Sequence, residues 1–264
     1  MRKRRLRMFA TLLKLHRMRS QDIILEYYDA SIYKEDFDNL REDRWLNDNN
    51  LTFWYEYLER TECLKISDEV SLARPSMAFL LAQSKVRYIF LPINNNSNVE
   101  HAEGGSHWSL LVVDRNHTQG HSGSASTYYY DTLGVVNLAE AENVAHKMAR
   151  LLGLDKLRMK VMTVQQQTNG SDCGVFVCMI TSLLLQRIVH AVTAAAVTAG
   201  AAGADNGSGS GSGDIDFEVQ HHQFHPNQGR HQASYTILEL ISKHGRGTEF
   251  NACDTNTSSM GSNT

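Results

Sequence analysis

Cys173 stands where a polar segment meets an apolar run. The segment "QQQTNGSD" (165–172) is typical of a loop, and the run "CGVFVCMI" (173–180) is typical of a buried helix. A thiol at the start of a helix faces unsatisfied N–H groups and the positive end of the helix dipole, which favour thiolate over thiol. With a histidine beside it, its pKa is expected below the ~8.5 of a free cysteine. The position suits a nucleophile for acyl transfer, although free cysteines are also common as small buried residues.

The other three cysteines have different surroundings. Cys63 follows a helix-like segment, Cys178 lies five residues into the apolar run where a core thiol is expected, and Cys253 lies in the C-terminal tail. Cysteines this few and this widely spread do not form a disulfide framework. We therefore expect a reducing, intracellular compartment.

An amide donor precedes the thiol by six residues. Gln167 is uncharged and can reach back toward the sulfur, where acyl transfer needs a donor to the oxyanion. Gly170 and Gly174 flank Cys173 closely, so the chain can turn tightly there. Asn169 and Asp172 are expected to form the turn, and the sequence indicates no role for Gln165 and Gln166.

Twelve histidines compete for the role of general base. His107 differs from most because it opens a β-type run that would hold its ring rigidly. Asp131 ends the run "TYYYD", where it could accept a hydrogen bond from the imidazole and fix its tautomer. Asp114 lies at the far end of the His107 run, roughly 20 Å away at about 3.3 Å per residue, so distance favours Asp131. Six histidines lie in polar stretches where solvation is the simpler interpretation: His117, His121, His221, His222, His225 and His231.

Helices and strands in mixed order must position these residues. A helix is expected within "WLNDNNLTFWYEYLER" (45–60), with Asn47 and Asp48 as candidate caps. A second helix is expected over 138–152, closed by Gly153. Short β-rich runs predict four strands: 86–93, 107–114, 127–131 and 158–164. This order implies an α/β or α+β layer structure.

Composition limits the function classes. The 264 residues are 42% hydrophobic and 21% charged, which is typical of a globular protein, and the net charge of −3 argues against a dedicated nucleic-acid binder. The run "MITSLLLQRIVH" is interrupted by Gln186 and Arg187, so no membrane-spanning helix is expected.

Composition also divides the chain into segments. We expect a basic N-terminal extension, a packed domain, a flexible insertion rich in Ala, Gly, Ser, His and Gln, a terminal helix that docks on the domain, and a loose tail: 1–21, 22–190, 191–233, 234–248 and 249–264. The extension is compatible with disorder, nuclear import, a mitochondrial presequence or a membrane-surface helix, and the first two are favoured. The stretch "HHQFHPNQGRH" lacks nearby cysteines and acids, so no metal site is expected.

Four blocks in order resemble a known family. "WLND", "GGSHWSLLVVD", "YYYDTLG" and "QQQTNGSDCGVFV" resemble the Ulp/SENP ubiquitin-like-protein-specific cysteine proteases. "INNNSN" and the short lead into His107 are most similar to the deneddylase branch. The resemblance covers roughly 22–190 and the last helix, and it implies a papain-like α+β fold with the nucleophile at the N-terminus of a core helix.

The resemblance also implies roles for single residues. Cys173 is then the nucleophile, His107 the base and acid, Asp131 the orienting acid and Gln167 the oxyanion donor. On the substrate side, Trp108 covers the diglycine tail, and the "WLND" motif brings Trp45 and Asp48 to that tail. A channel too narrow for any side chain would select glycine by steric exclusion. Without the resemblance, Trp108 is an ordinary aromatic residue and Asp48 a helix cap.

The implied function is that of a cysteine-type deneddylase. It would cleave after the diglycine of the neddylation modifier, removing it from cullins and other conjugates, without a metal or organic cofactor. The alternatives are a SUMO-specific protease and an inactive module that binds a ubiquitin-like tail. We expect a monomer in the cytoplasm and nucleus, with no nucleic-acid or membrane partner.

Overall fold

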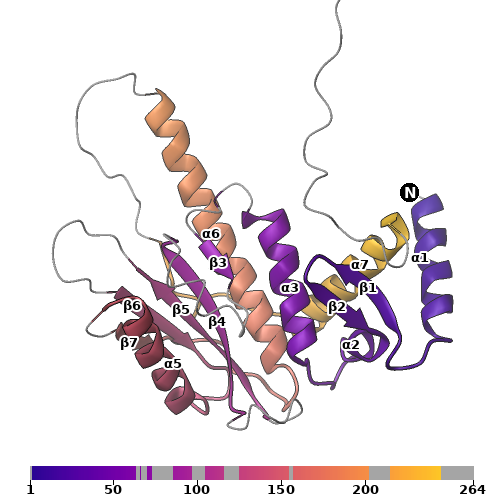
Figure 1. Cartoon of the computed structure of the whole chain (residues 1–264), viewed down its shortest axis with the longest axis horizontal. Coiled ribbons are helices and arrows are strands. Elements are labelled where there is room, and N and C mark those ends of the chain that lie inside the picture. Colours follow the sequence, from indigo (N-terminus) through magenta and orange to yellow (C-terminus); the bar gives the residue numbers. More distant parts are fainter. Residues whose placement is uncertain are drawn as a thin grey trace, which may run out of the picture.

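The computed structural model describes residues 2–63, 66, 70–72, 86–96, 105–115, 125–154, 157–201 and 215–244. Its centre is a five-stranded sheet in the order β3-β4-β5-β6-β7 (Figure 1). The central pairs are antiparallel and the two outer pairs are parallel, so the sheet is mixed. The strands span Val70–Leu72, Tyr88–Asn94, Trp108–Asp114, Ala125–Tyr130 and Leu157–Val161.

The sheet is buried on both faces because its strands alternate between two cores. On β5, Leu110 and Val112 belong to a large core that includes α6 (Cys173–Ala201), whereas Leu111 and Val113 belong to a smaller core under α5 (Leu138–Leu151). All four side chains are fully buried. Since successive strand residues point to opposite faces, one apolar run supplies both layers. The α+β class predicted from the sequence is confirmed.

A second group of elements packs against the other side of α6. A two-stranded antiparallel sheet, β1 (Ile23–Tyr27) and β2 (Ala30–Tyr33), leads through α2 (Lys34–Asp38) to α3 (Asp48–Thr61). Helix α3 is joined to α6 by two side-chain hydrogen bonds, from Trp54 Nε1 to Ser182 Oγ at 3.1 Å and between Tyr55 and Thr181 at 3.0 Å. These buried polar contacts fix the register of the two helices.

Helix α6 is longer and more apolar than the sequence analysis predicts. Among the described residues, its stretch Cys173–Ala195 is long and apolar enough to cross a membrane by length and composition, because Arg187 is the one charged residue within it. Half of its most apolar window is buried inside the protein, as in the core helix of a globular domain.

The terminal segment differs from its predicted bounds. Helix α7 spans Pro226–His244, so it begins eight residues before the predicted 234. Three side chains from the predicted flexible insertion are buried in the main core: Phe217, Val219 and Phe224. Stacking of Phe217 on Tyr128, with ring centroids 4.0 Å apart, ties this segment to β6. Burial of the aromatic side chains therefore holds this segment against the domain, although its polar composition predicted a flexible linker.

The basic N-terminus is also ordered, which contradicts the disordered extension. Helix α1 (Arg2–Leu15) lies along α7, and Leu15 is buried in the main core. The tail predicted over 249–264 lies outside the described residues.

Candidate active site

His107 and Asp131 meet at one edge of the central sheet. His107 directly precedes β5 and Asp131 directly follows β6, and these neighbouring strands are antiparallel. Two positions 24 residues apart in sequence are thereby brought together, with His107 Nε2 2.6 Å from Asp131 Oδ1. Asp114, the competing acid, lies at the opposite end of β5 and is paired with Arg87 at 3.0 Å. The pairing of β5 with β6 therefore places Asp131, and not Asp114, beside His107, as predicted from the length of the His107 strand.

The carboxylate of Asp131 is fixed by several donors. Tyr129 Oη donates to Oδ2 at 2.7 Å, and the backbone N–H groups of Leu133 and Asn137 donate to Oδ1 and Oδ2. Burial raises the pKa of Asp131, but the hydrogen bonds from His107, Leu133, Tyr129 and Asn137 outweigh it and lower the pKa to about 2. Asp131 is therefore a permanent anion beside the imidazole.

The imidazole of His107 is held between this carboxylate and the thiol of Cys173. Burial favours the neutral ring, but the hydrogen bond to Asp131 and the interaction with Cys173 outweigh it and raise the pKa of His107 to about 9. Because Nε2 is occupied by Asp131, the other ring nitrogen, Nδ1, is the one available to sulfur. A histidine ring between a carboxylate and a thiol is the arrangement of a general base beside a nucleophile.

Cys173 is the first residue of α6 and is only 4% exposed. The thiols of Cys63 and Cys178 are buried as well, and burial raises the pKa of each to about 12. Neither thiol would be ionised near neutral pH, which distinguishes both from a thiol paired with a histidine. Cys253 lies outside the described residues.

The three glutamines before Cys173 each hold a different contact. Gln165 exchanges two hydrogen bonds with the backbone of Phe224, and Gln166 accepts from the Gly134 N–H and donates to the Asp131 carbonyl. Gln167 accepts from Thr132 Oγ1 at 2.7 Å through Oε1. These contacts tie the loop to both neighbouring segments, and they give Gln165 and Gln166 structural roles that the sequence did not reveal.

Thr132 orients the carboxamide of Gln167. The Thr132 hydroxyl donates to Gln167 Oε1, which fixes the opposite atom of the amide as Nε2. The Thr132 carbonyl accepts from the Gln167 backbone N–H at 2.9 Å. One N–H of Gln167 Nε2 donates to the Asn169 carbonyl at 2.6 Å. The NH₂ group carries a second donor, which is the group suited to an oxyanion.

Trp108 bridges the sheet and the segment before α3. Its Nε1 donates to the Leu46 carbonyl at 2.9 Å. Gly174 lies beneath this bridge: a Cβ placed there would come within 3.0 Å of Leu46 Cβ and 3.4 Å of Trp108 Cδ1. The absence of a side chain next to the thiol therefore allows Leu46 and Trp108 to approach the start of α6.

The other two predicted substrate residues lie beside Leu46. Trp45 is 51% exposed, which is high for a tryptophan. Asp48 is the exposed first residue of α3, but the cap is Asn47, whose side chain accepts from the Asn50 N–H at 3.1 Å. The exposed positions of Trp45 and Asp48 leave both available to a ligand.

Arg230 is a site neighbour that the sequence analysis missed. Its buried guanidinium contacts Asp172 Oδ1 at 2.7 Å and donates to the carbonyls of Asn39, Arg41, Arg44 and Ser171. The second oxygen of Asp172 accepts from Asn169 at 2.8 Å. The signal was weak because Arg230 lies in the His-rich stretch that resembled a linker, and only its place before an apolar helical pattern could have indicated burial.

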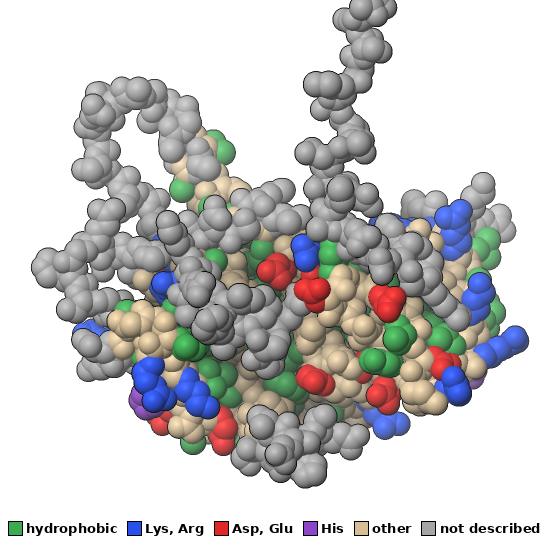
Figure 2. Space-filling model, viewed as in Figure 1, with side chains coloured by type: hydrophobic (Ala, Val, Ile, Leu, Met, Phe, Trp, Pro, Cys, Tyr) green, Lys and Arg blue, Asp and Glu red, His purple; other side chains and the backbone are tan. Residues whose placement is uncertain are grey.

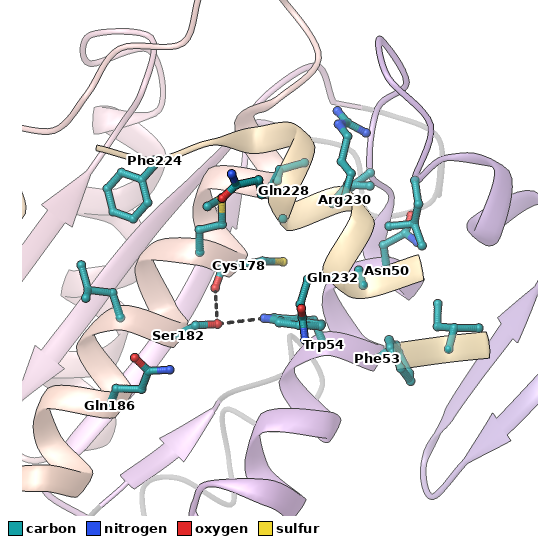
Figure 3. Close-up of a pocket in the computed structure, with 18 of the residues that line it drawn as sticks. Asn50, Phe53, Trp54, Cys178, Ser182, Gln186, Phe224, Gln228, Arg230 and Gln232 are labelled. Atoms are coloured by element: carbon teal, nitrogen blue, oxygen red, sulfur yellow. Dashed lines mark hydrogen bonds between the residues drawn. The ribbon is translucent and has the colours of Figure 1, made fainter. Parts of the chain in front are cut away.

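Two cavities lie near these residues. One, of about 330 Å³, opens between α3, α6 and α7 and is lined by mostly apolar side chains that include Trp54 and Met179 (Figure 3). It is separate from the candidate site because Cys173, His107 and Asp131 do not line it. A second, more polar cavity of about 430 Å³ borders Gln167 and Asp172. Within the described ranges, no group of three or more His, Cys, Asp or Glu side chains could hold a metal ion.

Comparison with known proteins agrees with this arrangement. Residues 82–198 match the model of the Ulp1 protease family, C-terminal catalytic domain. Sentrin-specific protease 8 of Homo sapiens is 32% identical over 191 residues, which cover 65% of this chain and 85% of that protein. The chain belongs to the Ulp1 protease family. The family resemblance predicted from the sequence is confirmed.

Other relatives of this Ulp1-family chain differ in length. NEDD8-specific protease 2 of Schizosaccharomyces pombe (strain 972 / ATCC 24843) is 36% identical over 187 residues, which cover 64% of this chain and 43% of that protein. The alignment with NEDD8-specific protease 1 of the same organism, at 31% identity, covers 44% of that relative. The chain thus spans less than half the length of these two proteins.

Solved structures establish the Ulp1-type fold. The SUMO protease Ulp1 with its catalytic cysteine oxidised to a sulfinic acid has a TM-score of 0.52 at 19% identity, covering 90% of this chain and 95% of that one. The Xanthomonas campestris effector XopD bound to ubiquitin has a TM-score of 0.52 at 20% identity, covering 74% and 92%. The predicted papain-like α+β fold of the Ulp/SENP type is therefore confirmed.

Proposed function

We propose that this chain is a cysteine protease that cleaves after the C-terminal diglycine of the neddylation modifier. The observation that carries the proposal is the 2.6 Å pair of His107 and Asp131, with the second ring nitrogen of His107 left for the Cys173 thiol at the start of α6. The choice of modifier rests on the names of relatives that include the NEDD8-specific proteases of S. pombe. Precursor processing and removal from cullins are the two reactions that such specificity would serve.

Each site residue has a separate role in the first half of the reaction, the acylation of Cys173. The Cys173 thiolate attacks the terminal glycine carbonyl carbon, forming a C–S bond and an oxyanion that accepts hydrogen bonds from Gln167 Nε2 and the Cys173 N–H. As the oxyanion collapses, the C–N bond breaks and His107 transfers its proton to the departing amine. Asp131 remains ionised throughout and holds the ring in place.

Hydrolysis then returns the enzyme to its starting state. His107 removes a proton from water, the resulting hydroxide attacks the thioester carbonyl, and the C–S bond breaks to release the thiolate and a C-terminal carboxylic acid, which loses its proton to solvent. His107 keeps the proton, so the thiolate–imidazolium pair is restored. The diglycine tail would reach Cys173 beside the Trp108–Leu46 bridge, which packs closely against the start of α6 because Gly174 has no side chain. Trp45 and Asp48 would contact the tail at its entrance.

A turnover assay with two modifiers tests the proposal. Fluorogenic C-terminal conjugates of NEDD8 and of SUMO are incubated with the full chain and with Cys173→Ala. We expect NEDD8 conjugate turnover that is faster than SUMO conjugate turnover and that Cys173→Ala abolishes. Faster SUMO turnover would identify the chain as a SUMO-specific protease. Failure of a diglycine-based covalent probe to label Cys173 would instead indicate an inactive binding module.

A further inference from the structure

Helix α1 presents an apolar ridge away from the body of the protein. Leu6, Phe9 and Leu13 are 62%, 61% and 54% exposed, and their i, i+3, i+7 spacing places them along one side of the helix. Leu12, next to this ridge, is 41% exposed. A contiguous row of large apolar side chains on a surface marks an interaction site more strongly than scattered ones do.

The opposite side of α1 is anchored. Leu15 is buried and Met8 packs against the main core, while Arg4 pairs with Glu239 of α7 at 2.5 Å and lies 5.5 Å from the Tyr235 ring centroid. The helix is therefore held in one rotational setting, with its anchored face on α7 and its apolar ridge outward. Figure 1 shows α1 at the end of the molecule away from the five-stranded sheet.

Basic residues flank the ridge on both sides. Helix α1 contains six Lys or Arg and no Asp or Glu. At 100° per residue, Arg5 falls on one flank of the ridge, and Arg7 and Lys14 fall on the other; all three are exposed. In Figure 2, blue Lys and Arg side chains alternate with green hydrophobic ones along this end of the molecule.

We propose that the outer face of α1 binds an anionic lipid surface. Apolar side chains would enter the boundary between headgroups and acyl chains while the flanking cations contact acidic headgroups, a division typical of interfacial helices. A nucleic acid would be a poorer match, since phosphate contacts do not require three large apolar side chains in a row. The contact would leave Cys173 and His107 free, because they lie on elements remote from α1. This proposal departs from the expectation of no membrane partner.

Vesicle co-sedimentation with the full chain tests the proposal. We expect binding to phosphatidylcholine vesicles that contain phosphatidylserine, weak binding to phosphatidylcholine alone, and a loss of binding at high salt. The triple variant Leu6→Ser, Phe9→Ser, Leu13→Ser should reduce binding at least about tenfold, and Arg5→Gln, Arg7→Gln, Lys14→Gln about a hundredfold. A matched control, Leu151→Ser with Val161→Ser, removes two exposed apolar side chains from other elements and should bind like the unmodified chain.

Three results would overturn the proposal. The first is equal vesicle binding by the unmodified chain and the apolar triple variant. The second is tight binding to duplex DNA that depends on the basic residues and not on the apolar ridge. The third is self-association in sedimentation velocity that the apolar triple variant abolishes, which would assign the ridge to a second copy of the chain. Turnover of a fluorogenic modifier conjugate in solution checks that the triple variant is folded.

Discussion

The Arg230 guanidinium lies 2.7 Å from the carboxylate of Asp172, the residue directly before Cys173. Arg230 is on α7, and in Figure 3 its side chain extends from that helix away from the centre of the cavity. The same guanidinium donates to four carbonyls, three of which belong to the segment 39–44 that precedes Trp45. One buried cation thus links α7 to both the turn before the nucleophile and the segment before the proposed tail channel.

Replacing Arg230 with lysine should impair catalysis in folded protein. An ammonium keeps the charge but cannot reproduce a planar fork that contacts Asp172 and several carbonyls at once. Displacements on the order of 1 Å at a reacting group can cost about a hundredfold in rate, so we expect kcat/KM to fall at least about tenfold. Arg230→Ala should also lower the free energy of unfolding by about 3–5 kcal/mol, because it leaves the Asp172 carboxylate without its cation.

Arg187 offers a matched control for the Arg230 variants. It also uses one guanidinium to hold main-chain carbonyls, those of Asp216 and Glu218, but it lies at the far end of the buried part of α6 from Cys173. Arg187→Lys should lower the melting temperature without changing kcat/KM or the pH dependence of Cys173 alkylation. If Arg230→Lys behaves in the same way, Arg230 has only a structural role.

The His107–Asp131 pair predicts a specific dependence on alkaline pH. The pKa of His107 is raised from 6.5 to about 9, so the folded protein retains a proton that the unfolded chain releases. This contribution to stability is complete below pH 6.5 and is lost as the pH rises through about 9. The Asp131 contribution has the opposite sign: it is present above its unfolded pKa of 3.8 and is lost as the pH falls through about 2.

Asp131→Asn tests the alkaline arm of this dependence. Without the carboxylate, the pKa of His107 should fall, so both the loss of stability and the alkaline limb of kcat/KM should move toward neutral pH. Thermal melting and kcat/KM across roughly pH 6 to 10, on the order of half-unit steps, would measure both shifts. An alkaline limb that stays near pH 9 in the variant would show that Asp131 does not set the protonation of His107.

Local sequence patterns predicted four of the five strands of the central sheet and the helices α3, α5 and α6, because the spacing of apolar residues in each run indicates which side chains are buried. The three-residue strand β3 is too short to show such a pattern. The strand predicted over 107–114 is β5, which begins one residue later, and the helix predicted over 138–152 is α5, which ends one residue earlier. His107 and Asp131 were identifiable because each lies at a strand end, where neighbouring antiparallel strands bring such positions together. The motif around Cys173 could be recognised without its long-range contacts, because the change from a polar loop to an apolar helix lies within the single stretch 165–180.

Contacts between distant segments account for what the sequence did not reveal. The polar stretch around Phe217 and Phe224 lacks any periodicity, and it is ordered only because both rings fit into a core made by β4, β6 and α6. Helix α1 has a weak apolar pattern, since its anchored face is narrow and its large apolar residues point outward. Arg230 resembled a surface residue because its acceptors come from residues up to 191 positions away.

Substitutions of Gln167 and of Thr132 should lower kcat by different amounts. Gln167→Ala removes the proposed side-chain donor to the oxyanion and should lower kcat by about a hundred- to a thousandfold with little change in KM. Thr132→Val removes the hydroxyl that orients the amide, so a smaller loss in kcat is expected, and Thr132→Ser should restore most of the rate. Single-turnover kinetics with a NEDD8 conjugate would separate acylation from binding. A near-normal kcat for Gln167→Ala would leave the backbone N–H groups as the only oxyanion donors.

Gly174→Ala should separate activity from stability. A methyl group at this position would lie 3.0 Å from Leu46 Cβ, so Leu46 and Trp108 must move by a few tenths of an ångström above the start of α6. Helix propensity favours alanine over glycine by about 0.5–1 kcal/mol, which offsets this crowding, and the melting temperature should change little. The displaced Leu46 and Trp108 would nevertheless alter the proposed binding channel for the diglycine tail, so we expect KM for a NEDD8 conjugate to rise about tenfold. Gly170→Ala is the matched control, because a Cβ there meets nothing within 4 Å. A Gly174→Ala enzyme with the KM of this control would exclude Leu46 and Trp108 as walls of the binding channel.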